Sequence, residues 1–323
     1  MTMDTLLDIR NFSMEYETGR GAVRALHDVS FSIAAGEIVG VVGESGCGKS
    51  SLVGAILRLS PGNARTRGEI FFKHRDLQQM DGREMRELRG SAVSAVFQDP
   101  MRTHNPVMTV GAQMTDIQHR ENISRSEKLK RAETMLSRVG ISDPGERLQQ
   151  YPHQLSGGML QRIAIGMALM SRPDLIIADE PTTALDATME MRTIEMLRDL
   201  QRDYGCAVLF VSHHLGVIAE LCKKVAVMYA GEVAEFGDVD DVFNRPAHPY
   251  TRRLLECDPG HAQRTSRGLP TIPGAVPDLS APSLGCAFAP RCDSAKSKCT
   301  SHRPPTFEDG GRRVACWLYE TES

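Results

Sequence analysis

The stretch from Gly43 to Ser51 restricts the fold of this chain more than any other feature. It reads Gly-Glu-Ser-Gly-Cys-Gly-Lys-Ser-Ser, follows the apolar run 38–42 and leads into the apolar run 52–57. Two apolar runs joined by a glycine-rich turn predict a strand, a loop and a helix. The sequence therefore predicts an α/β fold in which a helix N-terminus is open to an anion at this point.

The spacing inside this loop matches a phosphate-binding pattern. Gly43, Gly48, Lys49 and Ser50 fill G-x-x-x-x-G-K-[ST], in which glycines let backbone N–H groups turn around phosphate oxygens. We expect Lys49 to reach the β- and γ-phosphates of ATP and Ser50 to coordinate Mg²⁺. Cys47 lies beside Lys49 at a helix N-terminus, which predicts a lowered thiol pKa. The residues expected to contact the nucleotide are Gly43, Glu44, Ser45, Gly46, Cys47, Gly48, Lys49, Ser50 and Ser51.

Length and composition limit the remaining possibilities. The chain has 323 residues, of which 41% are hydrophobic, so it can form one large domain with an extension. Its net charge of −3 gives no general attraction to nucleic acid. The N-terminus lacks the apolar core of a secretory signal, and no run approaches the roughly 18 apolar residues that span a bilayer. We therefore expect a soluble protein that reaches a membrane only through partners.

Short β-type runs separated by turns lie before and after the loop. The runs 7–12, 22–26 and 29–33 precede the loop and predict an antiparallel β subdomain that leads into the run 38–42, and a further run, 69–72, follows the expected helix. Tyr16 belongs to this part of the chain. It either stacks on an adenine ring or is a tyrosine of the sheet surface.

Residues 101–170 have mainly helical spacing. Apolar residues recur with a helical period from Leu129 to Val139, with Ser126 as the expected N-cap and Gly140 as the C-terminal stop. This region is predicted to be a helical subdomain inserted into the α/β domain.

Polar side chains stand where three apolar runs end. They are Gln98, the pair Asp179 and Glu180, and His213. Because ligands of open α/β sheets bind at the carboxyl ends of strands, these side chains can reach a triphosphate. In a P-loop ATPase the first acid at such an end holds Mg²⁺, and the second orients or deprotonates the attacking water. Taken singly, each is more often a loop or structural residue, and only their order along the chain favours a site.

Two further helix starts are candidates for the same site. Ser156, followed by Gly157 and Gly158, offers a hydroxyl and free N–H groups to an anion, although a simple capped turn would look similar. Asp186 leads into a second apolar-periodic stretch through Leu200.

In this order the motifs resemble the ATP-binding subunit of an ABC transporter, over residues 6–255. The resemblance implies that two such domains sandwich two ATP molecules head to tail. Ser156, Gly157 and Gly158 of one domain would then complete the site around the nucleotide on the partner's loop. This arrangement explains why one chain has two anion-binding helix starts.

The resemblance also implies a role for each residue. Tyr16 stacks on adenine, Gln98 signals the state of Mg²⁺ to membrane subunits, and Asp186 bridges the dimer. Glu180 is the general base and His213 clamps the γ-phosphate. The side chains that would hold Mg²⁺ are Ser50, Gln98 and Asp179.

The tail of the chain narrows the resemblance. Met159 stands where most relatives have glutamine, and residues 246–251, 272–274 and 285–292 look like the extension of oligopeptide, dipeptide and nickel importer ATPases. The match is to the dipeptide-type subunit. It implies a second homologous ATPase, two membrane permease subunits and an extracytoplasmic solute-binding protein as partners, at the cytoplasmic face of the inner membrane. Import of di- or oligopeptides is the main interpretation, and nickel, a metal chelate, glutathione or another solute stays open.

Functions of other classes are less consistent with the sequence. A soluble ABC ATPase of DNA repair or translation would require a coiled-coil arm, tandem ATPase halves or a basic surface, and the sequence has none of these. A nonhydrolytic regulatory module is disfavoured because Glu180 and His213 are both present.

Four of the eight cysteines gather between residues 286 and 316, within the region 256–323 that is predicted to form a separate extension. They are Cys286, Cys292, Cys299 and Cys316. Their spacing is not the C-x₂₋₄-C of a structural zinc site. The resemblance to peptide importers implies a [4Fe-4S] cluster on the four thiolates. Zinc, or four buried reduced cysteines, remain alternatives.

Overall fold

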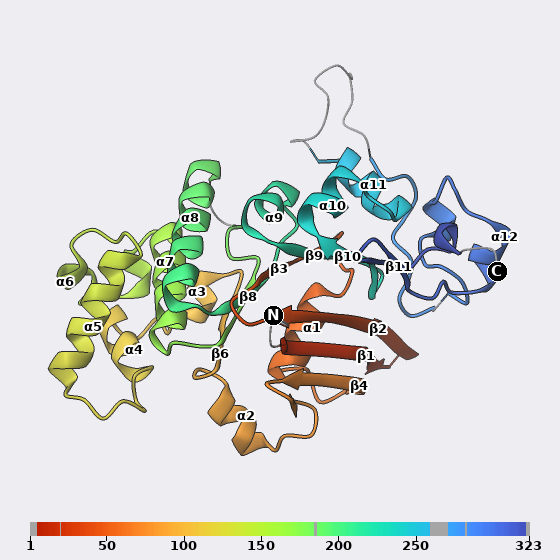
Figure 1. Ribbon diagram of the computed structural model, residues 1–323. Helices are drawn as coiled ribbons and strands as arrows, with labels where there is room; N and C mark the ends of the chain where they lie inside the picture. The colour runs from red at the N-terminus through yellow and green to blue at the C-terminus, as the bar shows by residue number, and fades with distance from the viewer. Residues whose placement is uncertain (1–4, 20, 184–185, 259–270, 282, 321–323) are drawn as a thin grey trace. The chain divides into compact units, whose positions relative to one another are not determined.

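The structure is a computed structural model (Figure 1), and it describes residues 5–19, 21–183, 186–258, 271–281 and 283–320. The described chain divides into two compact units. We call residues 81–211, together with 35–37, the helical unit. We call residues 4–34, 38–80 and 212–323 the loop unit, because it contains the stretch from Gly43 to Ser51.

The loop unit begins with an antiparallel sheet in the order β2-β1-β4-β5. Strands β1 (Thr5–Thr18) and β2 (Gly21–Ala34) pair over their whole length and lie side by side in Figure 1. In β2 the buried Val29, Phe31 and Ile33 alternate with more exposed residues, as expected for a strand with one buried face. The predicted antiparallel β subdomain is therefore confirmed.

Five further strands of the loop unit run in the order β11-β12-β10-β9-β3. Strand β3 (Ile38–Val42) is parallel to β9 and is buried along its whole length, as expected for a strand covered on both faces. Strand β12 pairs with β10 through Val314 and Arg313. The C-terminal extension is thus joined by main-chain pairing to the strands that carry the loop.

The remaining elements of the loop unit are short. The strands are β4 (Ala64–Phe72), β5 (Arg75–Asp76), β9 (Lys224–Tyr229), β10 (Glu232–Asp238), β11 (Phe307–Asp309) and β12 (Arg312–Val314). The helices are α1 (Lys49–Leu57), α9 (Leu215–Leu221), α10 (Val239–Asn244), α11 (Pro249–Glu256) and α12 (Ser297–Ser301), with 3₁₀ turns η2 (Ala289–Arg291) and η3 (Trp317–Tyr319).

The helical unit contains three parallel strands in the order β6-β7-β8, with β7 in the middle. Helix α7 packs against β6, α5 and α8, and Figure 1 shows α4 to α7 gathered together. Residues 101–170 contain helices and no strand, as predicted. The elements are β6 (Val93–Val96), β7 (Leu175–Asp179), β8 (Ala207–Val211), α2 (Gly82–Leu88), α3 (Pro100–Thr103), α4 (Val110–Asp116), α5 (Arg125–Arg138), α6 (Pro144–Arg147), η1 (Pro152–Gln154), α7 (Gly157–Met170) and α8 (Ala187–Tyr204).

One predicted helix start was wrong. Helix α5 begins at Arg125, and the Oγ of Ser124 accepts a hydrogen bond from the N–H of Glu127 at 3.2 Å. Ser126 therefore lies inside the first turn. Both serines precede the apolar repeat, and the repeat alone does not distinguish a cap from a first-turn residue.

The domain boundaries predicted from the sequence, 6–255 and 256–323, stay a prediction.

Among the described residues, no helix combines the length and the apolar character needed to cross a bilayer.

Candidate nucleotide site

Two glycines fix the shape of the loop between β3 and α1. Gly43 has φ +158°, and a Cβ there would lie 2.1 Å from the carbonyl oxygen of Met228. Gly48, the N-cap of α1, has φ +103°, and its Cβ would lie 2.6 Å from the carbonyl oxygen of Ala25. Any other residue at either position would collide with backbone, so only glycine permits this path. Because the N-cap residue is a glycine, it has no side chain to cap α1, and the start of this helix suits an anion.

Lys49 points back along the loop. Its Nζ donates to the carbonyl oxygens of Gly43 at 2.8 Å and Glu44 at 3.3 Å, and the residue is only 7% exposed. The next residue, Ser50, is exposed. The loop thus presents a buried ammonium and an accessible hydroxyl, the two groups that a triphosphate with Mg²⁺ uses.

The prediction of a lowered pKa for Cys47 was wrong. Burial raises the pKa of this thiol, and the charge of Lys49 offsets the effect only in part. Cys47 is 1% exposed, and its Sγ lies 3.9 Å from the Nζ of Lys49. The sequence reveals the neighbouring charge but not the burial, and burial is the larger effect.

Tyr16 lies beside the loop although it comes from β1. Its hydroxyl donates to the Oγ of Ser51 at 3.1 Å, and its side chain is partly buried. The position next to the loop agrees with the prediction, and the stacking role stays a prediction.

Glu44 is held by residues that the sequence analysis did not single out. Its backbone N–H donates to the hydroxyl of Tyr250 at 3.0 Å, and its carboxylate pairs with both terminal nitrogens of Arg291 at 2.8 and 3.1 Å. These partners lie more than 200 positions away. No local pattern could have identified them. The one available hint was an arginine between two cysteines of the extension.

His213 also belongs to the loop unit and is exposed. The ring of His214 packs edge-on against it, with 4.4 Å between ring centroids. The backbone N–H of His214 donates to the Oγ of the buried Ser212 at 3.0 Å. The exposed imidazole of His213 thus directly follows the buried residue Ser212.

In the helical unit, Asp179 and Glu180 stand at the end of β7. Glu180 has φ +48°, a left-handed conformation that is strained for a residue with a long side chain. It is held there because its N–H donates to the carbonyl of Val211 at 2.9 Å and its Oε2 accepts from the Oγ1 of Thr183 at 3.0 Å. Residues with a strained backbone conformation are often found at functional sites, and this favours Glu180 as a site residue.

The other predicted residues of the helical unit lie at element ends. Ser156 caps α7, where its Oγ accepts from the N–H of Met159 at 3.3 Å, and both Ser156 and Gly157 are exposed. Asp186 caps α8 by accepting from the N–H of Met189 at 2.9 Å. Gln98 is exposed after β6.

The predicted site residues therefore fall into two sets. The loop unit contains Tyr16, His213 and the stretch from Gly43 to Ser51, and within it Tyr16 is hydrogen-bonded to Ser51. The helical unit carries Gln98, Ser156, Gly157, Gly158, Asp179, Glu180 and Asp186.

The four cysteines of the extension line one pocket. Cys286, Cys292, Cys299 and Cys316 are free thiols, and its other walls include Phe288 and Trp317. The free space is about 20 Å³, close to the volume of one water. Among the described residues, no group of three or more acidic, cysteine or histidine side chains is arranged to hold a metal ion. The donor set suits an iron–sulfur cluster, but this arrangement does not support the expected cluster, because the pocket would have to open.

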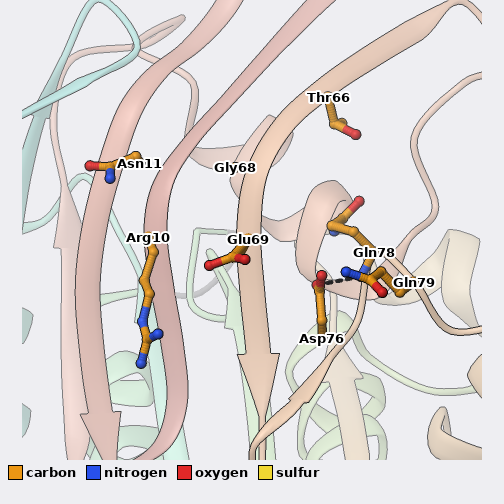
Figure 2. Close-up of a pocket in the computed structure, with 8 residues that line it drawn as sticks. All are labelled: Arg10, Asn11, Thr66, Gly68, Glu69, Asp76, Gln78 and Gln79. Carbon is orange, nitrogen blue, oxygen red and sulfur yellow. Dashed lines mark hydrogen bonds between the residues drawn. The ribbon is translucent and has the colours of Figure 1, made fainter.

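A cavity of about 620 Å³ lies on the antiparallel sheet (Figure 2). Two of the polar side chains on its wall are engaged with their neighbours. Arg10 pairs with Asp8 at 2.6 Å, and Asp76 accepts from the N–H of Gln78 at 2.9 Å, as the dashed line shows. None of the predicted site residues lines this cavity.

Comparison with known proteins decides the family. The family model described as "ABC transporter" matches residues 26–183. A second family model, described as "Oligopeptide/dipeptide transporter, C-terminal region", matches residues 234–299. The chain is 46% identical over 318 residues to the probable peptide ABC transporter ATP-binding protein y4tR of Sinorhizobium fredii, covering 97% of this chain and 95% of that protein. It belongs to the ABC transporter ATP-binding family. As an ABC ATPase, it hydrolyses ATP in a transporter.

Other members of the family support the same assignment. The chain is 44% identical over 323 residues to the dipeptide transport ATP-binding protein DppD of Bacillus subtilis, covering 98% of this chain and 96% of that protein. A solved ATP-binding cassette, a dimer in a post-hydrolysis state with ADP and Pi, is similar with TM-score 0.65 and 28% identity. It covers 72% of this chain and 99% of its own. The predicted α/β fold of a P-loop ABC ATPase is thereby confirmed.

Proposed function

We propose that this ABC ATPase energises the import of di- or oligopeptides as a peripheral subunit on the cytoplasmic face of the inner membrane. The observation that carries the proposal is the combination of the constrained phosphate loop with an extension matching the oligopeptide/dipeptide transporter C-terminal region. Relatives that match along nearly the whole chain are named for peptide or dipeptide transport.

Measurements of solute uptake by cells can distinguish peptides from the other possible transported solutes. A strain lacking this chain should lose uptake of a labelled dipeptide or tripeptide and keep uptake of the free amino acids. Re-expression of the intact chain is the control. Loss of nickel uptake with normal peptide uptake would contradict the peptide assignment and leave the ATPase assignment in place.

The proposed roles follow the two sets of residues. In the loop unit Lys49 binds the β- and γ-phosphates, Ser50 binds Mg²⁺, Tyr16 stacks on adenine and His213 contacts the γ-phosphate. Support comes from the buried ammonium of Lys49 and from the hydrogen bond between Tyr16 and Ser51.

In the helical unit Glu180 is the proposed general base, and Asp179 and Gln98 assist with Mg²⁺. Ser156, Gly157 and Gly158 are proposed to bind the γ-phosphate of a nucleotide held by a second, homologous ATPase subunit, and Asp186 to bridge the pair. The exposed start of α7 supports this assignment.

We propose that the two permease subunits contact the segment around Gln98, from residue 97 to residue 107. Three large apolar side chains are exposed there: Phe97 at 38%, Met101 at 51% and Val107 at 79%. Water-exposed apolar side chains in one short segment are characteristic of a protein contact.

Met101→Glu should therefore reduce transport about tenfold or more, because a carboxylate would enter an apolar interface. MgATP binding to the purified chain should be unchanged. Leu59→Glu is the matched control, because Leu59 is 54% exposed but lies in the loop unit. Normal transport by the Met101 variant, or equal losses in both variants, would refute this contact.

We further propose that the four thiols of the extension take up a [4Fe-4S] cluster. Support comes from the donor set alone, four cysteine thiols on the wall of one pocket, which would have to open to admit the cluster. Protein purified without oxygen should contain about four iron and four sulfide per chain and absorb in the visible range. Cys299→Ser should remove both signals. Protein that lacks iron, or binds zinc in its place, would contradict the proposal.

A further inference from the structure

Arg291, in the extension, has every N–H of its guanidinium group engaged. Nη1 and Nη2 bind the Glu44 carboxylate at 2.8 and 3.1 Å. Nη1 also donates to the hydroxyl of Tyr229 at 3.2 Å, Nη2 to the carbonyl of Ile272 at 3.1 Å and Nε to the carbonyl of Pro273 at 2.9 Å. A guanidinium group has five N–H donors, and here each has an acceptor. The side chain is only 4% exposed, so its position is fixed on all sides.

A second contact, from Tyr250 on α11, fixes the backbone of Glu44. The hydroxyl of Tyr250 accepts the Glu44 N–H at 3.0 Å, and Tyr250 is fully buried. The ring of Tyr250 packs on Tyr229 and Phe288, with centroids 4.6 and 5.4 Å away. Phe288 also lines the cysteine pocket. An aromatic cluster thus connects the cysteine pocket to the second residue of the phosphate loop.

Three separated stretches of sequence converge on Glu44 or on its partner Arg291. Residues 246–251 contribute Tyr250, residues 272–274 contribute carbonyl groups, and residues 285–292 contribute Arg291. All of them belong to the loop unit. The extension is therefore built around Glu44 as well as around its own cysteines.

The pairing also changes the charge of the loop. A carboxylate beside a bound triphosphate would repel it, and at short range such repulsion is large where water is scarce. The bidentate contact with Arg291 neutralises that carboxylate and holds it aside.

We propose that Arg291 is a positioning residue of the nucleotide site, through which the C-terminal extension sets the affinity of the phosphate loop for MgATP. Arg291 acts through Glu44 and touches no nucleotide. The inference rests on the proposed role of the loop, and it assigns to the extension a function in nucleotide binding.

The test compares MgATP affinity and turnover in the full-length chain assembled with its partners. Arg291→Ala should weaken MgATP binding about tenfold, because the carboxylate of Glu44 is left unpaired. Turnover at saturating MgATP should stay within about twofold. The double variant Glu44→Ala with Arg291→Ala should recover most of the affinity, since it removes the unpaired charge. A merely structural role would not produce that recovery.

Two controls separate this inference from its alternatives. Arg303→Ala removes another extension contact, with Glu232, that does not touch the loop, and it should leave MgATP affinity unchanged. Lys49→Ala should weaken binding in any case if the loop holds the phosphates. Wild-type affinity in Arg291→Ala, equal losses in Arg303→Ala, or no recovery in the double variant would overturn the inference. Unchanged binding in Lys49→Ala would instead overturn the proposed site.

Discussion

Glu180→Gln is expected to lower ATP turnover about 10³-fold while MgATP still binds. The amide keeps the size of the side chain and its ability to accept from the Oγ1 of Thr183, but it cannot take a proton from water. The assembled transporter should therefore accumulate in an ATP-bound form. Single-turnover hydrolysis of labelled ATP and retention of unhydrolysed ATP on the purified complex measure the two parts of this result.

Glu195→Gln is the matched control for this variant. Glu195 lies on α8 in the same unit and is exposed, and the substitution removes the same charge. It should leave turnover unchanged. Normal turnover in Glu180→Gln would refute Glu180 as the base, and loss of MgATP binding would show that the side chain contributes to binding.

Lys49→Ala is expected to weaken MgATP binding about 100-fold. The substitution removes a charge-assisted donor directed along the loop, and such a donor is worth roughly 1.5–3 kcal/mol. It also leaves the carbonyls of Gly43 and Glu44 without their partner. Equilibrium binding of MgATP to the purified chain measures the loss.

Lys223→Ala makes the same change of charge at an exposed position after α9 and should bind MgATP normally. Equal affinities in the two variants would remove Lys49 from the site. A loss in both would indicate an effect of net charge and not of the loop.

The local elements of the fold could be predicted from the sequence because their signals lie within a few residues. The glycines of the loop, the apolar run of β3 and the capping by Ser156 each depend on neighbours in the chain. The helix start at Ser124 was missed because Ser126 satisfies the same local rule.

Properties that depend on distant contacts could not be predicted. Burial of Cys47 reverses the pKa shift expected from Lys49, and burial is decided by tertiary packing. Likewise, Arg291 of the extension and Tyr250 of α11 reach Glu44 only after both segments have packed against the loop. The left-handed backbone of Glu180 has no local signature either, because turn-favouring residues usually mark that conformation.

The close approach of Gly43 and Gly48 to the carbonyls of Met228 and Ala25 has a kinetic consequence. Both carbonyls belong to strands, so the curvature of the loop is built by the sheets and does not await a ligand. The first contact of a nucleotide with this loop then requires no ordering of the loop itself, and we expect its rate to be governed by diffusion and orientation.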